Sequence, residues 1–176
     1  MNVKNFLYCF DENYNFQAFT SIYSLLENVN IKVSLYLIHN LNKEAISIPN
    51  KILEHNNLES INIYKFKDSK YKFENIQNTH VSSATYYRLF LENYLPSNLE
   101  NIIYLDPDTI IISDFIDKAE IYFEELNRKN ILIAGKTEFY NLVENSNERF
   151  SRLNIDNRYF NAGVLFINYS KWTKEN

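Results

Sequence analysis

The spacing of hydrophobic positions changes from segment to segment along this chain, and each spacing predicts one kind of element. Short apolar runs and alternating positions predict β-strands, at residues 3–10, 32–38, 60–66, 102–105, 131–134 and 164–167, with the fourth strand resuming at 110–112. Apolar spacings of three and four predict helices, at residues 14–26, 84–94 and 117–127, with a further helical segment over 43–55 that Pro49 interrupts and a last helix that begins near Trp172. The polar and aromatic segment 68–79 has no sustained period and indicates a surface excursion.

The order of these elements predicts the fold class. Strands that alternate with helices are typical of an α/β protein with a mainly parallel sheet and helices on both faces. In open sheets of this type, ligands bind at the carboxyl ends of the strands. Acidic residues follow the first and the fourth predicted strand, so we expect these two strand ends to form one crevice. A length of 176 residues fits one domain, which we assign to residues 1–176.

The composition excludes several kinds of site. Gly135 and Gly163 are the only glycines, so the chain has neither a GxGxxG nor a Walker-type phosphate loop. Cys9 is the only cysteine, which excludes an intramolecular disulfide and a cysteine-cluster metal site. With a net charge of −4 and no basic run, nucleic acid is not an expected partner. A phosphorylated ligand would therefore need a cation.

The distribution of apolar residues bears on the cellular location. No apolar stretch approaches the roughly 20 residues of a transmembrane helix, so we expect no transmembrane segment. Residues 3–10 lack a strong basic segment and a small-residue cleavage site, so they predict a buried strand and not a signal peptide. We expect a cytoplasmic protein.

The most specific local signal is the acidic pair that follows the apolar strand at 102–105. Side chains two apart on an extended segment face the same way, so Asp106 and Asp108 can present both carboxylates to one cation. Mg²⁺ and Mn²⁺ prefer oxygen ligands, commonly one or two carboxylates completed by substrate phosphates and water. The pair therefore suits a metal–diphosphate site. The alternative is that Asp-Pro-Asp is only a turn, because Asp and Pro are both favoured in turns.

A second polar cluster follows the first predicted strand. It comprises Cys9, Asp11, Asn13 and Tyr14. A uracil ring could stack on the tyrosine and pair with the carboxylate and amide groups. The alternative is that Asp11 or Asn13 is the N-cap of the next helix.

Two other polar residues stand out from their surroundings. Arg88 lies on a predicted helix that is otherwise aromatic and aliphatic, where its guanidinium could clamp a diphosphate or hold the acidic pair in place. A surface salt bridge is its alternative role. Asn161 could hydrogen-bond a sugar hydroxyl, and the nearby Gly163 permits close backbone approach, although both also suit an ordinary turn.

Four segments carry a family resemblance. They are DENY at residues 11–14, HVSSATYYR at 80–88, IYLDPD at 103–108 and YFNAGVLFIN at 159–168, the last followed by Lys171 and Trp172. In this order they resemble glycosyltransferase family 8, which includes bacterial lipopolysaccharide galactosyl- and glucosyltransferases and glycogenin. The resemblance covers essentially the whole chain. It implies a Rossmann-like nucleotide-diphospho-sugar transferase fold of the GT-A type.

The resemblance also implies roles for single residues. The residues expected to line the uridine pocket are Cys9, Asp11, Asn13 and Tyr14. The residues expected to bind Mn²⁺, or Mg²⁺, together with the ribose–diphosphate are Asp106 and Asp108. The residues expected to contact the donor sugar or diphosphate, and so to act in catalysis, are Arg88, Glu138 and Asn161.

The activity implied by the resemblance is transfer of a hexose, with retention of anomeric configuration, from a UDP-sugar to a glycan or lipopolysaccharide-type acceptor. The family's later motifs, an Asp-Gln-Asp-like segment and a histidine-containing HxxGxxKPW-like segment, do not follow residues 159–168, because His39, His55 and His80 all precede Gly163. We therefore expect an N-terminal portion of a longer protein, whose remaining part could provide peripheral membrane association.

Two other functions fit some of the same residues. A chain without the later motifs could be a non-catalytic UDP-sugar-binding fragment. Alternatively, haloacid-dehalogenase-like phosphatases carry a strand followed by DxDx(T/V), in which Asp106 would be the nucleophile and Asp108 the acid/base. Here Ile110 stands where that motif expects Thr or Val.

Overall fold

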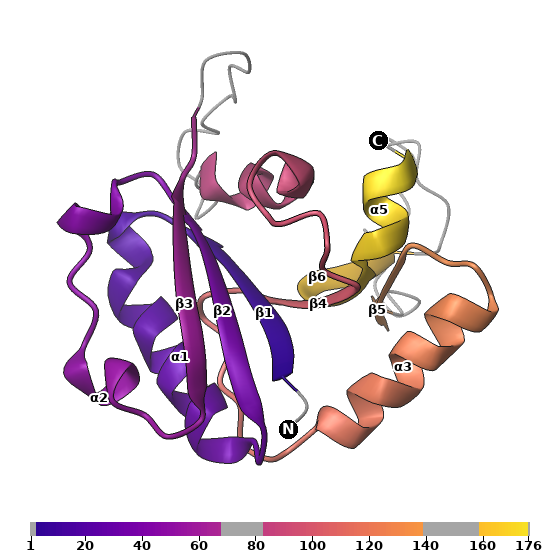
Figure 1. The fold of residues 1–176 in the computed structure, drawn as a ribbon, viewed down its shortest axis with the longest axis horizontal. Coiled ribbons are helices and arrows are strands. Elements are labelled where there is room, and N and C mark those ends of the chain that lie inside the picture. Colours follow the sequence, from indigo (N-terminus) through magenta and orange to yellow (C-terminus); the bar gives the residue numbers. More distant parts are fainter. Residues whose placement is uncertain (1–2, 68–82, 139–158, 176) are drawn as a thin grey trace, which may run out of the picture.

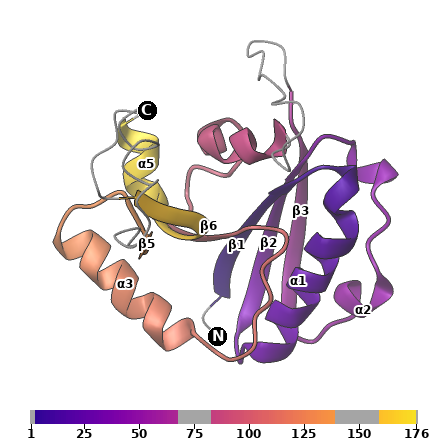
Figure 2. The same ribbon diagram turned by 180° about the vertical axis from the view of Figure 1, so that it is seen from behind.

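The computed structural model describes residues 3–67, 83–138 and 159–175. Within these residues the chain forms a six-stranded sheet in the order β3-β2-β1-β4-β6-β5 (Figures 1 and 2). The strands are β1 (Val3–Phe10), β2 (Lys32–His39), β3 (Leu58–Lys65), β4 (Asn101–Leu105), β5 (Ile133–Glu138) and β6 (Tyr159–Asn168). β1 pairs in parallel with β2 and β4, and β2 with β3, whereas β6 runs antiparallel to both β4 and β5. The predicted mainly parallel sheet is confirmed.

Helices cover both faces of the sheet, as expected. One face carries α1 (Asn15–Asn28), α2 (Asn50–Leu53) and α3 (Ile116–Arg128). The other face carries two 3₁₀-helices, η3 (Ser83–Leu89) and η4 (Leu91–Asn93), and the helix α5 (Tyr169–Glu175). None of the helices in residues 3–67, 83–138 and 159–175 combines the length and the apolar character that a transmembrane span needs.

The alternation of side chains along β1 explains why it is apolar throughout. Phe6, Tyr8 and Phe10 face α1 and α3, while Leu7 and Cys9 face the opposite core. Successive side chains of a strand point to opposite faces, so a strand covered on both sides needs apolar residues at every position. β1 therefore lies at the centre of both cores.

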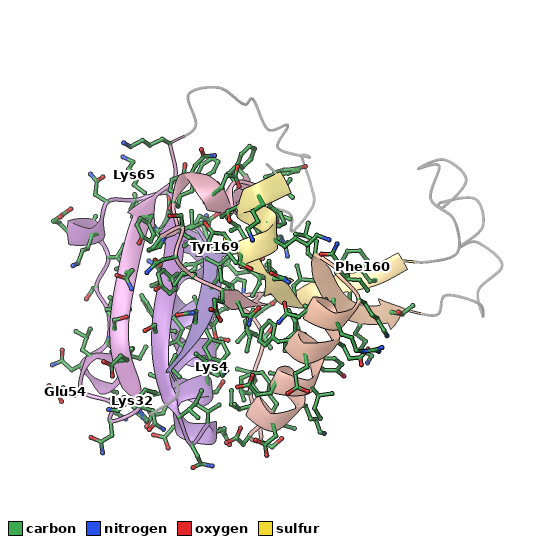
Figure 3. All side chains as sticks on the ribbon, turned by 45° about the vertical axis from the view of Figure 1, so that its right-hand side comes forward. Lys4, Lys32, Glu54, Lys65, Phe160 and Tyr169 are labelled. Atoms are coloured by element: carbon green, nitrogen blue, oxygen red, sulfur yellow. The ribbon has the colours of Figure 1, made fainter. Side chains whose placement is uncertain are left out.

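On the second face, one tyrosine joins the C-terminal helix to η4. Tyr169 is fully buried, and its hydroxyl donates to the main-chain carbonyls of Leu91 at 3.4 Å and Leu95 at 3.2 Å. Figure 3 labels this tyrosine beside α5, and Phe160 on the side of the molecule away from Lys32 and Glu54. Through Tyr169, α5 therefore packs against η4 in the core of this face.

Several predicted elements differ from those observed. The helix predicted at 84–94 is instead the pair of 3₁₀-helices, in which the N–H of Phe90 bonds to the carbonyl of Tyr87 at 3.1 Å. Within η3, the ring of Tyr87 stacks on Phe66 with centroids 4.0 Å apart. The helical segment 43–55 is split by Pro49 into a 3₁₀ turn, η2 (Lys43–Ala45), and α2.

The other differences concern strands. Residues 110–112 form no strand, because the main chain of Ile111 bonds instead to side chains of α1, namely Ser24 Oγ at 2.9 Å and Asn28 Nδ2 at 3.1 Å. The last two strands lie over residues 133–138 and 159–168, so both were predicted too short. The excursion predicted at 68–79 lies outside the described residues.

Candidate functional site

A cleft opens where β1 and β4 end. These neighbouring strands are parallel, so their carboxyl ends meet at one edge of the sheet. The cleft is lined by residues of three segments, Cys9, Phe10, Tyr14, Thr85, Arg88, Tyr104, Asp106, Pro107 and Asp108. Its volume of about 120 Å³ is below the roughly 300 to 1,000 Å³ of pockets that enclose a drug-sized ligand. It can therefore enclose only part of a large substrate.

Asp106 is the most constrained acidic residue of the cleft. One carboxylate oxygen, Oδ1, accepts a hydrogen bond from Arg88 Nη1 at 3.2 Å and another from the hydroxyl of Tyr104. The Arg88 guanidinium also lies over the Tyr104 ring, 4.6 Å from its centroid, in cation–π geometry. Burial raises the pKa of the Tyr104 phenol, so the group stays protonated and remains a donor.

Arg88 is itself fixed by main-chain oxygens. Its Nε donates to the carbonyl of Thr85 at 3.0 Å, within the same 3₁₀-helix, and its Nη1 donates to the carbonyl of Ala162 on β6 at 2.8 Å. Only 15% of the Arg88 side chain is exposed, which distinguishes this ion pair from a surface salt bridge. Of the roles considered for Arg88, holding the acidic pair in place is the one that these contacts support.

An irregularity in β6 brings its backbone to Asp106. The pairing with β5 jumps from Gly135 opposite Leu165 to Lys136 opposite Asn161, so the intervening residues bulge. In this bulge the carbonyl of Gly163 accepts the N–H of Asp106 at 2.7 Å. Bulges commonly re-aim the chain next to functional sites, and this one brings the carbonyl of Ala162 to Arg88 and the carbonyl of Gly163 to Asp106.

Gly163 is closely packed against two polar side chains. A Cβ at this position would lie 3.1 Å from Asp106 Oδ2 and 3.0 Å from Asn161 Oδ1. The Asn161 side chain also accepts the N–H of Gly163 at 2.8 Å. The predicted close backbone approach at Gly163 is therefore observed, and it leaves the second oxygen of Asp106 beside Asn161.

The second acidic residue lies on a turn. The N–H of Thr109 bonds to the carbonyl of Asp106 at 3.1 Å, which closes a turn over Pro107 and Asp108. Asp108 is exposed and lines the same cleft as Asp106. The turn and the acidic pair, considered above as alternatives, are both present.

The donor set of this turn can be compared with the needs of a divalent ion. Among the described residues, no group of three or more His, Cys, Asp or Glu side chains could hold a metal. Mg²⁺ is commonly bound by one or two protein carboxylates, and a substrate diphosphate and water complete its coordination shell. Asp106 and Asp108 supply two carboxylates. The small residue at Gly163 keeps the space beside Asp106 Oδ2 free of a side chain. The residues present fit such an ion.

The segment of residues 11–15, called the base loop below, follows β1. Asp11 is buried and caps the 3₁₀-helix η1 (Glu12–Tyr14), because its Oδ1 accepts the N–H of Asn13 at 3.0 Å. This N-cap is the alternative role considered for Asp11. Tyr14 lines the cleft, whereas Asp11 and the exposed Asn13 are not among its lining residues.

The remaining predicted site residues occupy different positions. Cys9 lines the cleft as a buried thiol whose pKa is raised by burial, so it acts there as a small protonated group. Glu138 ends β5 opposite Tyr159, and its side chain lies outside the described residues.

Four residues of the cleft were not predicted as site residues, namely Phe10, Thr85, Tyr104 and Pro107. Two of these, Tyr104 and Thr85, hold Asp106 and Arg88. Tyr104 was counted only as part of an apolar strand, and Thr85 only as part of a helix. The signal for Tyr104 was present, because a residue two before Asp106 on an extended segment faces the same side. No comparable signal exists for the carbonyl of Thr85, which becomes an acceptor only once η3 has formed.

The model of the family described as glycosyl transferase family 8 matches residues 5–176. The chain belongs to glycosyltransferase family 8. The match includes the three segments that line the cleft and also the bulge of β6.

Two related proteins match this family 8 chain over almost its whole length. It is 28% identical to a putative glycosyltransferase of Haemophilus influenzae, over 98% of the chain and 50% of that protein. It is 29% identical to the lipopolysaccharide 1,2-glucosyltransferase of Escherichia coli K12, over 96% of the chain and 48% of that enzyme. The chain thus spans about half the length of these relatives.

Solved structures show the same fold. An active-site mutant of LgtC superimposes with a TM-score of 0.73 at 20% identity, over 98% of this chain and 60% of that one. The glycosyltransferase GlyE of Streptococcus pneumoniae superimposes with a TM-score of 0.63 at 23% identity, over 99% of this chain and 36% of that one. These similarities, together with the sheet order, establish the GT-A-type glycosyltransferase fold.

Proposed function

We propose that this chain is the donor-binding part of a metal-dependent enzyme that transfers a hexose from a UDP-sugar. The observation that supports this most is the fixed Asp106 at the end of β4. Its carboxylate is held on one oxygen by Arg88 and Tyr104, while the other faces the space beside Gly163 and shares the cleft with Asp108. Two carboxylates in a chain without phosphate-binding glycine loops favour a cation as the means of binding a diphosphate.

In this proposal Asp106 and Asp108 would hold Mn²⁺ or Mg²⁺. When bound, such an ion neutralises the charge that builds on the departing diphosphate. Arg88 balances the charge of Asp106 and keeps the carboxylate oriented, and its position at the cleft also suits a contact with the diphosphate or the donor sugar.

The other proposed roles follow the geometry of the cleft. Tyr14 provides an aromatic surface for the uracil ring next to Cys9, with Asp11 and Asn13 of the base loop as polar partners. Asn161 lies beside Asp106 across Gly163, where a sugar hydroxyl could reach it. Glu138, at the end of the neighbouring strand, is proposed as a further sugar contact on the family resemblance alone.

We propose a glycan or lipopolysaccharide-type acceptor and retention of anomeric configuration. The acceptor class is supported by the Escherichia coli relative, which is described as a lipopolysaccharide 1,2-glucosyltransferase. Because the chain spans about half of that relative, the activity and the acceptor are proposals for the whole protein.

A second candidate is that the chain binds UDP-sugar without transferring it. The half-length match to the relatives favours this possibility for the isolated chain. Measurements of hydrolysis and transfer from UDP-sugars, alongside binding, distinguish the two. The phosphatase alternative loses support because the match to family 8 extends over residues 5–176.

Titration calorimetry tests the shared premise of both candidates. UDP should bind in the presence of Mn²⁺ or Mg²⁺, and its affinity should fall at least about tenfold in EDTA, a change of about 1.4 kcal/mol. Uridine nucleotides should also bind more tightly than adenosine or guanosine nucleotides. Equal affinity for UDP with metal and with EDTA would remove the metal bridge from the proposal.

A further inference from the structure

One buried polar side chain next to the cleft has no role in the proposal above. His39 ends β2, pairs in sheet register with Phe10 and is completely buried. The ring of Phe10 meets the imidazole edge to face, with centroids 4.9 Å apart. A polar ring in such surroundings must satisfy its nitrogens by hydrogen bonds, because an unpaired buried polar atom is costly.

Both nitrogens of His39 have partners, and one of these partners fixes the tautomer. The N–H of Leu41 approaches Nδ1 at 2.9 Å, and Nε2 lies 3.0 Å from Asn15 Oδ1. A backbone N–H can only donate, so Nδ1 is the acceptor and carries no proton. A neutral imidazole then has its proton on Nε2, which donates to Asn15.

This arrangement links two segments that are far apart in sequence. Asn15 is the last residue of the base loop and the first residue of α1. Asp11 closes the other end of the loop by accepting the N–H groups of Asn13, on Oδ1, and Tyr14, on its carbonyl, both at 3.0 Å. The imidazole therefore fixes the base loop to the end of β2, while the loop presents Tyr14 to the cleft.

We propose that His39 is a positioning residue for nucleotide binding, whose neutral imidazole anchors the base loop through Asn15 and thereby holds Tyr14 at the cleft. His39 is not among the residues that line the cleft, so it acts through Asn15 and not by contact with a ligand. The nucleotide part of this inference rests on the proposed function, whereas the anchoring of the base loop does not.

The charges around the ring give the anchor a pH dependence. Burial lowers the pKa of His39 below its ordinary value of 6.5, against the opposing effects of the Glu12 and Asp11 carboxylates and of a hydrogen bond to the main chain of Asp11. On the other side, Lys65 of β3 pairs in register with His39. Because the folded pKa lies below the unfolded one, the ring is neutral at pH 7. Its contribution to stability is present above pH 6.5 and is lost as the pH falls through the lowered value.

Protonation breaks the anchor at a specific atom. Once Nδ1 carries a proton, it can no longer accept the N–H of Leu41, and the two donors face each other. The imidazole must then shift, which weakens its bond to Asn15. Acidification should therefore loosen the base loop before the rest of the fold.

Two substitutions separate the bonds of His39. In His39→Asn the amide can still accept from Leu41, but the shorter side chain no longer reaches Asn15. In His39→Gln the longer amide keeps that reach and cannot titrate. His55→Gln serves as the matched control, because His55 pairs with Glu27 in the last turn of α1, at the opposite end of this helix from the base loop.

Hydrogen exchange of the nucleotide-free chain tests the anchor, and calorimetry with UDP-glucose tests its consequence. UDP-glucose is the probe because its diphosphate does not titrate between about pH 5 and 8, the range in which histidine side chains ordinarily change charge. In His39→Asn, exchange at the amides of Asn13 and Tyr14 should rise about tenfold and UDP-glucose affinity should fall by a similar factor. His39→Gln should stay close to wild type at pH 7 and lose the weakening of affinity that wild type and His55→Gln show on acidification.

The outcomes separate this inference from the proposed function. Unchanged exchange at the base loop in His39→Asn, or an acid-dependent loss of affinity that persists in His39→Gln, would overturn the role of His39. If wild type binds no uridine nucleotide but His39→Asn still accelerates exchange, the anchor holds and the proposed function fails. If His39→Asn does not fold, the comparison of His39→Gln with wild type across pH still decides.

Discussion

The two strand ends that form the cleft are stabilised by contacts of different range. After β1, the base loop is closed by Asp11, which accepts N–H groups two and three residues ahead of it. After β4, Asp106 is held by Arg88, 18 residues away in sequence, and Arg88 in turn is held by the carbonyl of Ala162, 74 residues away. Apart from its contacts with the end of β2, made by Asn15 to His39 and by Glu12 to Asn40, the base loop is thus closed locally. The acidic turn, in contrast, is oriented only when η3, β4 and β6 have come together.

This difference has a functional consequence within the proposed mechanism. A hydrogen bond made by neighbours in sequence survives small shifts between the layers of the fold. The orientation of a carboxylate held by three separate segments does not survive such shifts, because it depends on how each segment packs against the others. The metal end of the cleft should therefore respond more strongly than the base end to substitutions that leave the ligand contacts themselves intact.

The largest expected effect comes from neutralising the exposed acid of the turn. Asp108→Asn should leave the melting temperature in EDTA nearly unchanged, because Asp108 is exposed and Asp106 is already paired with Arg88. With Mn²⁺ and UDP present, it should lose the ligand-induced stabilisation, about 2.7 kcal/mol at a hundredfold excess over the dissociation constant. Thermal melts with and without Mn²⁺–UDP measure both quantities.

Asp106→Asn is the matched variant for this measurement. It should lower the melting temperature even in EDTA, because it removes the charge that Arg88 neutralises. If Asp108→Asn keeps the full ligand-induced shift, Asp108 does not bind the metal and the exposed carboxylate is only part of a turn.

A smaller effect is expected from removing the long-range support of Asp106. Arg88→Met keeps the length of the side chain but loses its bonds to Asp106 and Ala162. The free energy of unfolding should fall by about 2 kcal/mol, the range for a lost hydrogen bond to a charged group. Denaturant unfolding measures this loss, and calorimetry should show weaker Mn²⁺–UDP binding although both carboxylates remain.

Arg88→Lys serves as the control for charge. A lysine restores the positive charge but cannot donate to Asp106 and Ala162 at once in the planar geometry of a guanidinium. Full recovery of binding in this variant would mean that charge alone, and not orientation, explains the role of Arg88.

The same contrast of range explains what sequence could predict. The strands at 3–10 and 32–38 were found because burial on both faces leaves a continuous apolar signal. The bulge of β6 and the antiparallel pairing of β6 with β4 were not predicted, because both depend on the register between distant segments. Likewise η3 stands where an α-helix was predicted, and its packing of Tyr87 on Phe66 is a contact between distant segments with no local signal.

Within the site, the acidic pair was recognised because both its residues lie in one short segment. Arg88 was singled out, but its partners Thr85 and Ala162 contribute main-chain carbonyls, and any residue type provides a carbonyl. The chemistry of the cleft was thus visible in the side chains, while the means of orienting them was not.

The smallest expected effect comes from the base loop, which Asp11 closes by local hydrogen bonds. Asp11→Ala removes the side-chain acceptor for the N–H of Asn13, and loss of such an N-cap costs about 1 kcal/mol. Asp11→Asn keeps an acceptor oxygen and removes only the charge, so its unfolding free energy should stay close to that of wild type. The pair therefore separates capping from any contact that the Asp11 carboxylate makes with a base.

The two readouts for these variants are denaturant unfolding and the affinity for uridine relative to adenosine nucleotides. If Asp11 acts only as a cap, the preference for uridine should fall in Asp11→Ala and persist in Asp11→Asn. If its carboxylate also pairs with the uracil ring, both variants should lose the preference while only Asp11→Ala loses stability. Mn²⁺-dependent binding of the diphosphate should persist in both variants. Asp106 is oriented by Arg88, which is held by Ala162, and Asp11 takes part in neither contact. Loss of that metal dependence in Asp11→Ala would show that the two strand ends are coupled and that the local and long-range contacts form one cooperative unit.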